Sequence, residues 1–344
     1  MNINNNNKSV RHPGAGRFLI AMAAFCMLAS ACHHAEPMRL LGEAQGTYYS
    51  IQYYDPQQRN FQPQIDSLLD AFDLSASLWV DSSLLRQVNA NLTDSLDDIL
   101  HFLLTNSMMV EEYTGGAFNC RVGRLVQAWG FSFKQRKEPD STELSRLLQS
   151  TQAAFTLDGH HFVYKDPSVE FDFNAIAQGY ASDLVAQFLE SQGIESYLVD
   201  IGGEVIAHGR KADKSPWKVG IERPAEDSLS APVVETAIPL VDRSVVTSGS
   251  YRKYYEKDGV KYSHTIDPST GRPVTHSLLS VSVVEKECWL ADAMATAYMV
   301  MGLDRAKRFI AAHPKGPGTD AVFFIYDSCG TMKTYATPVW ERLK

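Results

Sequence analysis

The chain has 344 residues, with 32 lysines and arginines against 40 aspartates and glutamates, and a formal net charge of -8 at pH 7. A chain of this length can bury a large core and form one or two domains. Its basic residues are scattered rather than gathered in a stripe, so the composition argues against a nucleic-acid partner.

The first 31 residues have the pattern of a secretory signal. An apolar run of eleven residues at 18–28 follows three basic residues: Lys8, Arg11 and Arg17. This run is shorter than the roughly 20 residues that a membrane-spanning helix requires. Residues 28–32 resemble a bacterial lipoprotein signal, although Leu28 lies four positions before Cys32 rather than three. We expect export to the periplasmic side of a bacterial membrane and lipidation at Cys32, with an ordinary signal peptide as the alternative.

The mature chain, residues 32–344, is expected to form one elaborated domain, because no repeat or clear linker divides it. Beyond Cys32 it has three cysteines and no C-x-x-C pair, which makes zinc and redox motifs poor interpretations. The three can form at most one disulfide: Cys120, Cys288 and Cys329.

Apolar periodicity and turn residues predict the elements in chain order. The first half is expected to contain a strand at 47–54, helices at 62–78 and 96–114, a glycine stop at 115–116, a strand at 169–173 and a helix from about 178 to 192. Strands follow at 197–201, 204–208, 217–221, 233–240 and 278–284, then a helix at 289–301. Helices packed on a largely antiparallel sheet indicate an α+β fold.

Asp292 and Thr296 are four residues apart on the last predicted helix, so their oxygens project from one face. Their neighbours are almost all apolar, which predicts a buried helix whose carboxylate needs a partner. A carboxylate and a hydroxyl suit Mg²⁺, which completes its shell with water and substrate phosphate. In the alternative, Asp292 caps the helix and Thr296 bonds back to a carbonyl.

A strand at 169–173 followed by a helix opening near Gly179 would present backbone N–H groups and a positive dipole end to an anion. This arrangement predicts a phosphate site, although the dinucleotide fingerprint G-x-G-x-x-G is missing. Gly179 equally suits close packing between helices, and this structural interpretation stays open.

His264 precedes a turn formed by Asp267-Pro268-Ser269-Thr270-Gly271. Together, His264 and Asp267 offer a base near an anion. The alternatives are a hydrogen-bonded strand histidine and an aspartate that holds its own turn. The segment 247–249, Thr-Ser-Gly, offers hydroxyl and amide donors, or is simply a turn.

These blocks in combination resemble the ApbE-type flavin transferases, which are FAD:protein FMN transferases. The resemblance extends from residue 46 to about residue 302 and rests on six blocks: 116–119 (GAFN), 174–180 (NAIAQGY), 202–204 (GGE), 247–249 (TSG), 264–271 (HTIDPSTG) and 291–296 (ADAMAT). The family implies an exported, often lipid-anchored enzyme that binds FAD and Mg²⁺. It attaches FMN to a threonine or serine of an acceptor protein, for which membrane electron-transfer subunits are the implied class, and releases AMP.

The resemblance also implies roles for individual residues. The metal ligands would be Asp292, Thr296 and the carbonyl of Ala175. The FAD contacts would be Gln45, Trp79, Ala117, Phe118, Asn119, Asp172, Gln178, Gly203, Thr247 and Ile266. Three of these depart from common family residues: Gln178 replaces a lysine, Asn119 an aspartate and Gln45 a methionine. The departures bear on affinity and turnover more than on the fold.

Phosphoryl transfer mainly requires positioning and charge neutralisation. We therefore expect Mg²⁺ on the diphosphate, and His264 with Asp267 as the base for the acceptor hydroxyl. Two other functions remain open: a Mg²⁺-dependent FAD diphosphatase that forms FMN and AMP, and a non-catalytic flavin-binding lipoprotein.

Overall fold

The computed structural model describes Met1 and residues 36–131, 138–224, 233–250, 254–257 and 260–344. The rest of the predicted signal sequence and Cys32 lie outside the described residues. Residues 37–344 group into one compact unit. In the described part of the chain, no helix has the length and apolarity needed to cross a membrane.

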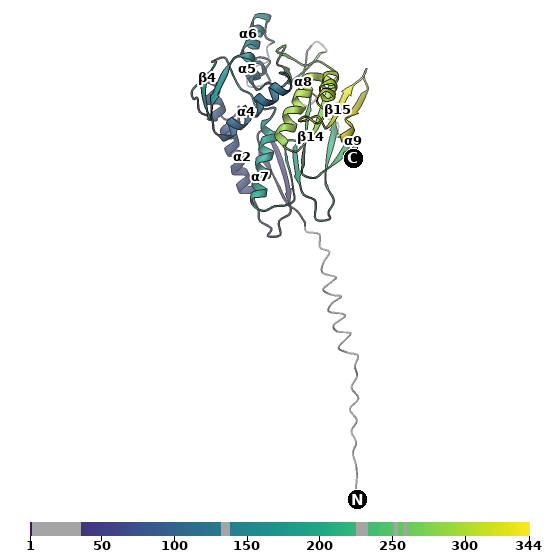
Figure 1. Ribbon diagram of the computed structural model, residues 1–344. Helices are drawn as coiled ribbons and strands as arrows, with labels where there is room; N and C mark the ends of the chain where they lie inside the picture. The colour runs from purple at the N-terminus through teal and green to yellow at the C-terminus, as the bar shows by residue number, and fades with distance from the viewer. Residues whose placement is uncertain (2–35, 132–137, 225–232, 251–253, 258–259) are drawn as a thin grey trace. The chain divides into compact units, whose positions relative to one another are not determined.

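An eight-stranded antiparallel sheet forms the centre of this unit (Figure 1). Its strands follow the order β1-β2-β5-β6-β9-β14-β15-β16, and every neighbouring pair is antiparallel. Their bounds are β1 Met38–Ala44, β2 Thr47–Tyr53, β5 Tyr197–Ile201, β6 Glu204–His208, β9 Arg243–Gly249, β14 Leu278–Glu285, β15 Ala321–Asp327 and β16 Met332–Ala336. The predicted α+β class is confirmed.

Four helices supply most of the apolar side chains on one face of the sheet: α2 (Gln62–Ala76), α4 (Asp98–Tyr113), α7 (Ala177–Ser191) and α8 (Cys288–Ala312). Helix α7 packs on β5 and β6, while α8 packs on β9 and β14. The apolar faces of these helices and the strand residues that point toward them form the largest buried cluster. Burial of this surface is the main favourable term for the fold.

A second apolar cluster covers the opposite face. It is formed by the β7–β8 ribbon (Trp217–Arg223 and Val233–Leu240), by α9 (Pro338–Leu343) and by outward residues of the sheet. Trp217 and Trp340 are almost fully buried there. Because strand side chains alternate between faces, neighbouring residues of β9 belong to different cores: Val246 to the first and Val245 to the second.

A third, smaller cluster holds a hairpin against two short helices. The hairpin is β12–β13 (Ile266–Asp267 and Arg272–Pro273), and the helices are α5 (Gly123–Ala128) and α6 (Ser141–Gln152). Ile266 packs beside Trp129, whose indole Nε1–H donates to the carbonyl of Gly271 at 2.7 Å. The remaining elements are α3 Leu84–Asn89, η1 Cys120–Val122, β3 Phe155–Asp158, β4 His161–Lys165, β10 Tyr254–Lys257 and β11 Val260–Ser263.

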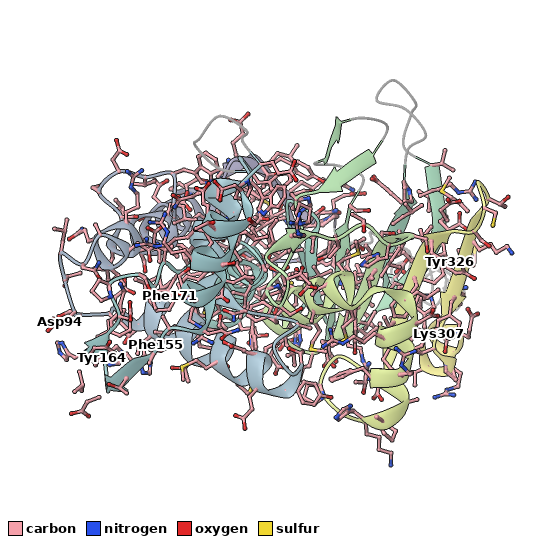
Figure 2. All side chains as sticks on the ribbon, turned by 90° about the horizontal axis from the view of Figure 1, so that it is seen from above. Asp94, Phe155, Tyr164, Phe171, Lys307 and Tyr326 are labelled. Atoms are coloured by element: carbon pink, nitrogen blue, oxygen red, sulfur yellow. The ribbon has the colours of Figure 1, made fainter. Side chains whose placement is uncertain are left out.

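The predicted strand at 169–173 is wrong, because this segment is not part of a sheet. Its backbone groups bond to loop and helix termini instead: the side chain of Asn89 both donates to the carbonyl of Phe171 and accepts from its N–H, each at 2.8 Å. The N–H of Asp172 donates to the carbonyl of Cys120 at 2.7 Å. Phe171 packs edge-on against Phe155, and the two rings lie together at one end of the molecule in Figure 2.

The helix predictions agree with the structure, with shifts of a few residues at their ends. The last helix, however, continues beyond 301 as far as Ala312. Gly302 lies inside it with φ 71° and ψ 168°, so the element is two helical segments joined at a kink. This conformation favours glycine. The first segment carries Asp292 and Thr296.

Candidate functional site

The N-terminal ends of α7 and α8 meet at Gly179 and Asp292. The backbone N–H of Gly179 donates to Oδ2 of Asp292 at 3.2 Å. A Cβ atom at position 179 would lie 2.6 Å from the carbonyl oxygen of Cys288 and 2.9 Å from Cβ of Asp292. The close-packing interpretation of Gly179 is therefore confirmed, and the contact it permits brings a backbone donor to the carboxylate.

Asp292 is only 5% exposed. Burial raises the pKa of its carboxyl, the hydrogen bond from Gly179 opposes this rise and the charge of Asp183 adds to it, and together they bring the pKa to about 7. A charged form in such surroundings is costly unless a positive group compensates it. Since the carboxylate accepts from a different helix, the alternative in which it merely caps its own helix does not describe this contact.

The carbonyl of Ala175 lies at the same helix terminus. Asn174, Ala175 and Ile176 form the turn that leads into α7, and Oδ1 of Asp172 holds this turn by accepting from the N–H of Asn174 at 2.9 Å. In a continuing helix the amide of Gly179 would donate to the carbonyl of Ala175, four residues earlier. Here that amide donates to Asp292 instead.

Thr296 lies one turn further along α8 and meets the neighbouring strand. Its Oγ1 is 3.3 Å from Oγ of Ser248 on β9. Thr247, the FAD contact implied by the resemblance, instead pairs its hydroxyl with that of Ser282 on β14 at 2.7 Å. Ser248 is therefore the hydroxyl of this strand that contacts Thr296 of the candidate metal site.

Gln178 approaches the turn between β5 and β6, which contains Gly203. The side-chain amide of Gln178 lies close enough to Gly202 that a Cβ atom there would be 3.1 Å from Nε2. Gly203 donates its N–H to Oδ1 of Asp200 at 2.9 Å. The turn therefore lies beside the first turn of α7 through Gln178.

Gln45 occupies the tight turn between β1 and β2, with φ 54°. Among the described residues, both atoms of its side-chain amide are buried without a hydrogen-bond partner. Such orphaned polar atoms are costly in a folded protein. A bound ligand with hydrogen-bonding groups would satisfy them, which fits the FAD contact expected at this position.

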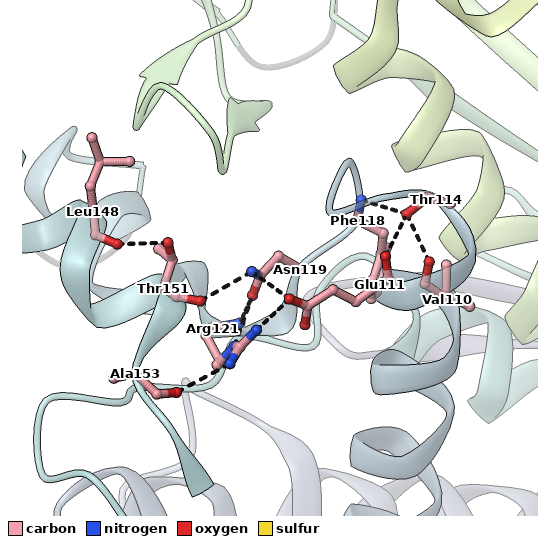
Figure 3. A network of polar contacts seen from close by, with 9 residues as sticks. All are labelled: Val110, Glu111, Thr114, Phe118, Asn119, Arg121, Leu148, Thr151 and Ala153. Carbon is pink, nitrogen blue, oxygen red and sulfur yellow. Dashed lines mark hydrogen bonds and ion pairs between the residues drawn. The ribbon is translucent and has the colours of Figure 1, made fainter. Parts of the chain in front are cut away.

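The 117–119 segment is held between α4 and α6 by a polar network (Figure 3). Ala117 and Phe118 are buried, and the N–H of Phe118 donates to Oγ1 of Thr114 at 3.1 Å. The amide of Asn119 donates to Glu111 and to the carbonyl of Thr151, each at 3.2 Å. The Asn119 side chain is thus held in place by the protein itself.

Asp172 and Trp79 differ in their exposure to solvent. Asp172 is buried, and burial raises the pKa of its carboxyl. Hydrogen bonds from the backbone and side chain of Asn174 oppose this rise. Trp79 follows α2 and is 60% exposed, so its ring presents a large apolar face. A pocket of about 560 Å³ is lined by residues close to them in sequence, among them Leu78 and Glu170. No predicted site residue lines this pocket directly.

His264 and Asp267 come from the hairpin that α5 and α6 support. His264 lies in a bend between β11 and β12, rather than in a strand. Oδ1 of Asp267 accepts from the N–H and the hydroxyl of Ser269, at 2.8 and 2.7 Å. Asp267 therefore holds its own turn, as the structural alternative predicted, and this contact engages one of its oxygens.

Asp292, which accepts from Gly179 of α7, and Thr296, which contacts Ser248, carry hard oxygen atoms on the first segment of α8. Asp292, Thr296 and the carbonyl of Ala175 supply oxygen ligands of the kind that Mg²⁺ prefers. Few protein ligands leave room for water and phosphate oxygens. Ser248 belongs to the 247–249 segment that was expected to offer donors, whereas Asp183 was not predicted to take part, although an acid within a buried helix was a signal available for it.

Comparisons with known proteins agree with this geometry. A sequence model of the ApbE family matches residues 45–323. The chain is 36% identical over 300 residues to the FAD:protein FMN transferase of Vibrio cholerae, covering 84% of this chain and 88% of the relative. It is 31% identical over 322 residues to that of Escherichia coli K12, covering 90% of each.

Two solved structures share the fold. The apo flavinyl transferase ApbE of Pseudomonas stutzeri superimposes with a TM-score of 0.79 at 30% identity, covering 91% of this chain and 98% of that one. The flavin transferase ApbE of Vibrio cholerae superimposes with a TM-score of 0.78 at 33% identity, covering 90% and 100%. On the family match and these relatives, the chain belongs to the ApbE family.

Proposed function

We propose that this protein is an FAD:protein FMN transferase that moves the FMN part of FAD onto a threonine or serine hydroxyl of an acceptor protein and releases AMP. The observation that carries the proposal is the buried carboxylate of Asp292, held by the N–H of Gly179 and paired along α8 with Thr296. Relatives that share this fold bear the name of that activity.

Asp292, Thr296 and the carbonyl of Ala175 would hold Mg²⁺. The bound ion would neutralise charge on the diphosphate, which is the main requirement of phosphoryl transfer. The raised pKa of Asp292 supports this assignment, because a cation would compensate the buried carboxylate. The N-terminus of α7 adds a positive dipole end beside the same group.

Flavin binding would use the residues on either side of this terminus. The unsatisfied amide of Gln45 would bond to polar groups of FAD, and the exposed ring of Trp79 would stack on an aromatic ring. Backbone groups of the 117–119 segment, with Asp172, Gln178, Gly203, Thr247 and Ile266, would complete the walls. Asn119 would act through its backbone, since its side chain is engaged.

His264 is proposed as the base that takes the proton of the acceptor hydroxyl. The hydroxyl oxygen then bonds to the phosphorus of the FMN part, and the phosphorus–oxygen bond to AMP breaks. Asp267 would shape the turn that carries His264, because its carboxylate holds the N–H and hydroxyl of Ser269. General bases of this kind contribute about 10²- to 10⁴-fold to a rate.

Export and lipid attachment at Cys32 are part of the same proposal. The basic residues, apolar run and cysteine of the first 32 residues support it. An enzyme held at the periplasmic side of a membrane would meet acceptors exposed there, such as electron-transfer subunits. Labelling of cells with a radioactive fatty acid tests it: label lost on Cys32→Ser supports the anchor, while label retained or absent throughout contradicts it.

The activity is tested with the soluble chain that begins after Cys32, incubated with FAD, Mg²⁺ and a protein carrying an acceptor threonine. A mass gain of one FMN on the acceptor, with AMP released and both lost in Asp292→Ala, supports the transferase. AMP and free FMN without labelling would instead identify a diphosphatase. Bound FAD without AMP would identify a flavin-binding protein.

A further inference from the structure

Asp183 lies in α7, one helical turn after Gly179, and faces the start of α8. Its Oδ1 accepts from the N–H of Cys288 and its Oδ2 from the N–H of Trp289, each at 2.9 Å. The side chain is 5% exposed. A charged carboxylate in that position is stabilised by two backbone donors and by the positive end of the α8 dipole.

The two helices cap each other. Within the described structure, neither Ile176 of α7 nor Glu287 of α8, the residues at the N-cap positions, makes a side-chain capping hydrogen bond. Instead, Asp183 of α7 accepts from α8, and Asp292 of α8 accepts from α7 through Gly179. One N–H group at the start of α7 and two at the start of α8 are therefore met by a carboxylate from the other helix.

This exchange links Asp183 to the candidate metal site. Asp292 lies only one turn beyond Cys288 and Trp289, so the bonds to Asp183 fix both the position and the rotation of α8 where its carboxylate emerges. We propose that Asp183 is a positioning residue: by capping α8 it orients Asp292 and Thr296 for a divalent cation, without touching that cation. The inference rests on the metal site of the proposed function.

The test measures metal binding rather than FMN transfer. Mn²⁺ is titrated into the metal-free soluble chain, and free Mn²⁺ is followed by electron paramagnetic resonance, for the wild type, Asp183→Asn and Asp183→Ala. Partners that orient metal ligands typically contribute about 10- to 100-fold to metal affinity. Asparagine keeps one acceptor oxygen, so we expect about a 10-fold loss for Asp183→Asn and a greater loss for Asp183→Ala.

Asp140 supplies a matched control. It caps α6 by accepting from the N–H groups of Thr142 and Glu143, each at 2.9 Å. Asp140 therefore makes two backbone hydrogen bonds, as Asp183 does. Asp140→Asn and Asp140→Ala remove a helix cap elsewhere, so Mn²⁺ affinity should remain within about twofold of the wild type. A similar loss in these variants would mean that general destabilisation causes the effect, and would overturn the proposal.

Other outcomes also decide it. A folded Asp183→Asn variant that binds Mn²⁺ with wild-type affinity would overturn the positioning role. Equal losses of Mn²⁺ affinity in Asp183→Asn and Asp183→Ala would also overturn it, because then only the charge of the carboxylate would matter. If Asp183→Ala does not fold, amide exchange of Asp183→Asn decides. Faster exchange at Cys288 and Trp289 together with weaker Mn²⁺ binding supports the proposal, and unchanged exchange contradicts it.

The proposed function can fail separately from this inference. A wild-type chain that binds Mn²⁺ but transfers no FMN contradicts the transferase and leaves the role of Asp183 to the affinities above. A wild-type chain that binds no Mn²⁺ overturns both the metal site and the positioning role.

Discussion

Gly179 and Asp292 join two helices through one hydrogen bond, 3.2 Å long, from a backbone N–H to a buried carboxylate. The bond exists because position 179 has no side chain: the backbones of α7 and α8 approach too closely for a Cβ atom. One glycine therefore determines both a packing contact and the geometry of a candidate metal ligand.

Replacing Gly179 with alanine is expected to destabilise the protein and weaken metal binding together. The new Cβ would meet Cys288 oxygen at 2.6 Å and Trp289 Cα at 2.8 Å, so helix backbone must move. Overpacking of this kind costs about 1–3 kcal/mol. Thermal unfolding and Mn²⁺ titration measure the two effects. Gly220→Ala, near only the Val234 side chain, is the control; a Gly179→Ala variant that behaves like it would contradict the prediction.

Two serines on neighbouring strands separate a role in the site from a role in the sheet. Ser248 on β9 contacts Thr296 on α8, whereas Ser282 on β14 pairs with Thr247 on β9. We expect Ser248→Ala to weaken Mn²⁺ binding several-fold. Ser282→Ala should cost about 1 kcal/mol of stability, the usual value of one hydrogen bond, with unchanged Mn²⁺ affinity. Equal Mn²⁺ affinities in the two variants would remove Ser248 from the site.

The sequence was informative wherever a pattern is local. Asp292 and Thr296 were predicted as a pair because a four-residue spacing on an apolar helix places two oxygens on one face, and the helix lies where it was predicted. The strand predicted at 169–173 is wrong although its residues do alternate between apolar and polar. The backbone of Phe171 pairs with the side chain of Asn89, 82 residues away, rather than with another strand. The capping of α8 by Asp183 likewise joins residues 105 positions apart.

The network around Asn119 explains why an asparagine suits this chain. Its amide donates to Oε1 of Glu111, which also pairs with Arg121, and Figure 3 shows the three side chains meeting. Burial raises the pKa of Glu111, and Arg121 opposes this shift. An aspartate at position 119 would exchange a donor for a second negative charge.

Asn119→Asp should therefore lower the free energy of unfolding by roughly 1–3 kcal/mol, the range for a buried group left without its partner. Adding Glu111→Gln should restore part of this loss, because the glutamine amide can donate to the new carboxylate. A double-mutant cycle by chemical denaturation measures the coupling. Additive effects would show that the two side chains do not interact.

Asp55 gives the fold a defined acid sensitivity. It is 4% exposed and accepts from the guanidinium of Arg59 at 2.7 Å, which holds the pKa of its carboxyl at about 2. Because the folded pKa lies below the unfolded value near 3.8, the stabilisation is complete above about pH 4 and is lost as the pH falls through 2. Asp55→Asn should cost about 1–2 kcal/mol at pH 7.

The difference in stability between Asp55→Asn and the wild type should shrink as the pH falls from 4 to 2, in denaturant titrations at each pH. Asp304→Asn, at an exposed position on α8, is the control. A difference that stays constant across this range would mean that the ion pair with Arg59 contributes nothing that depends on charge.

His264 is the residue on which the proposed chemistry depends most directly. His264→Asn keeps a polar side chain but removes the base, so FMN transfer should fall by about 10²- to 10⁴-fold. FAD affinity should stay within about twofold, because the residues proposed to hold FAD and the metal are untouched. Single-turnover FMN transfer and fluorescence titration with FAD measure the two quantities.

His276→Asn is the matched control: His276 contacts the carbonyl of Met299 at 2.7 Å beside the α8 kink, so its loss should lower stability rather than the rate of transfer per folded molecule. Unchanged turnover in His264→Asn would assign the proton to another group, and an equal loss of FAD affinity and turnover would make His264 a binding residue instead.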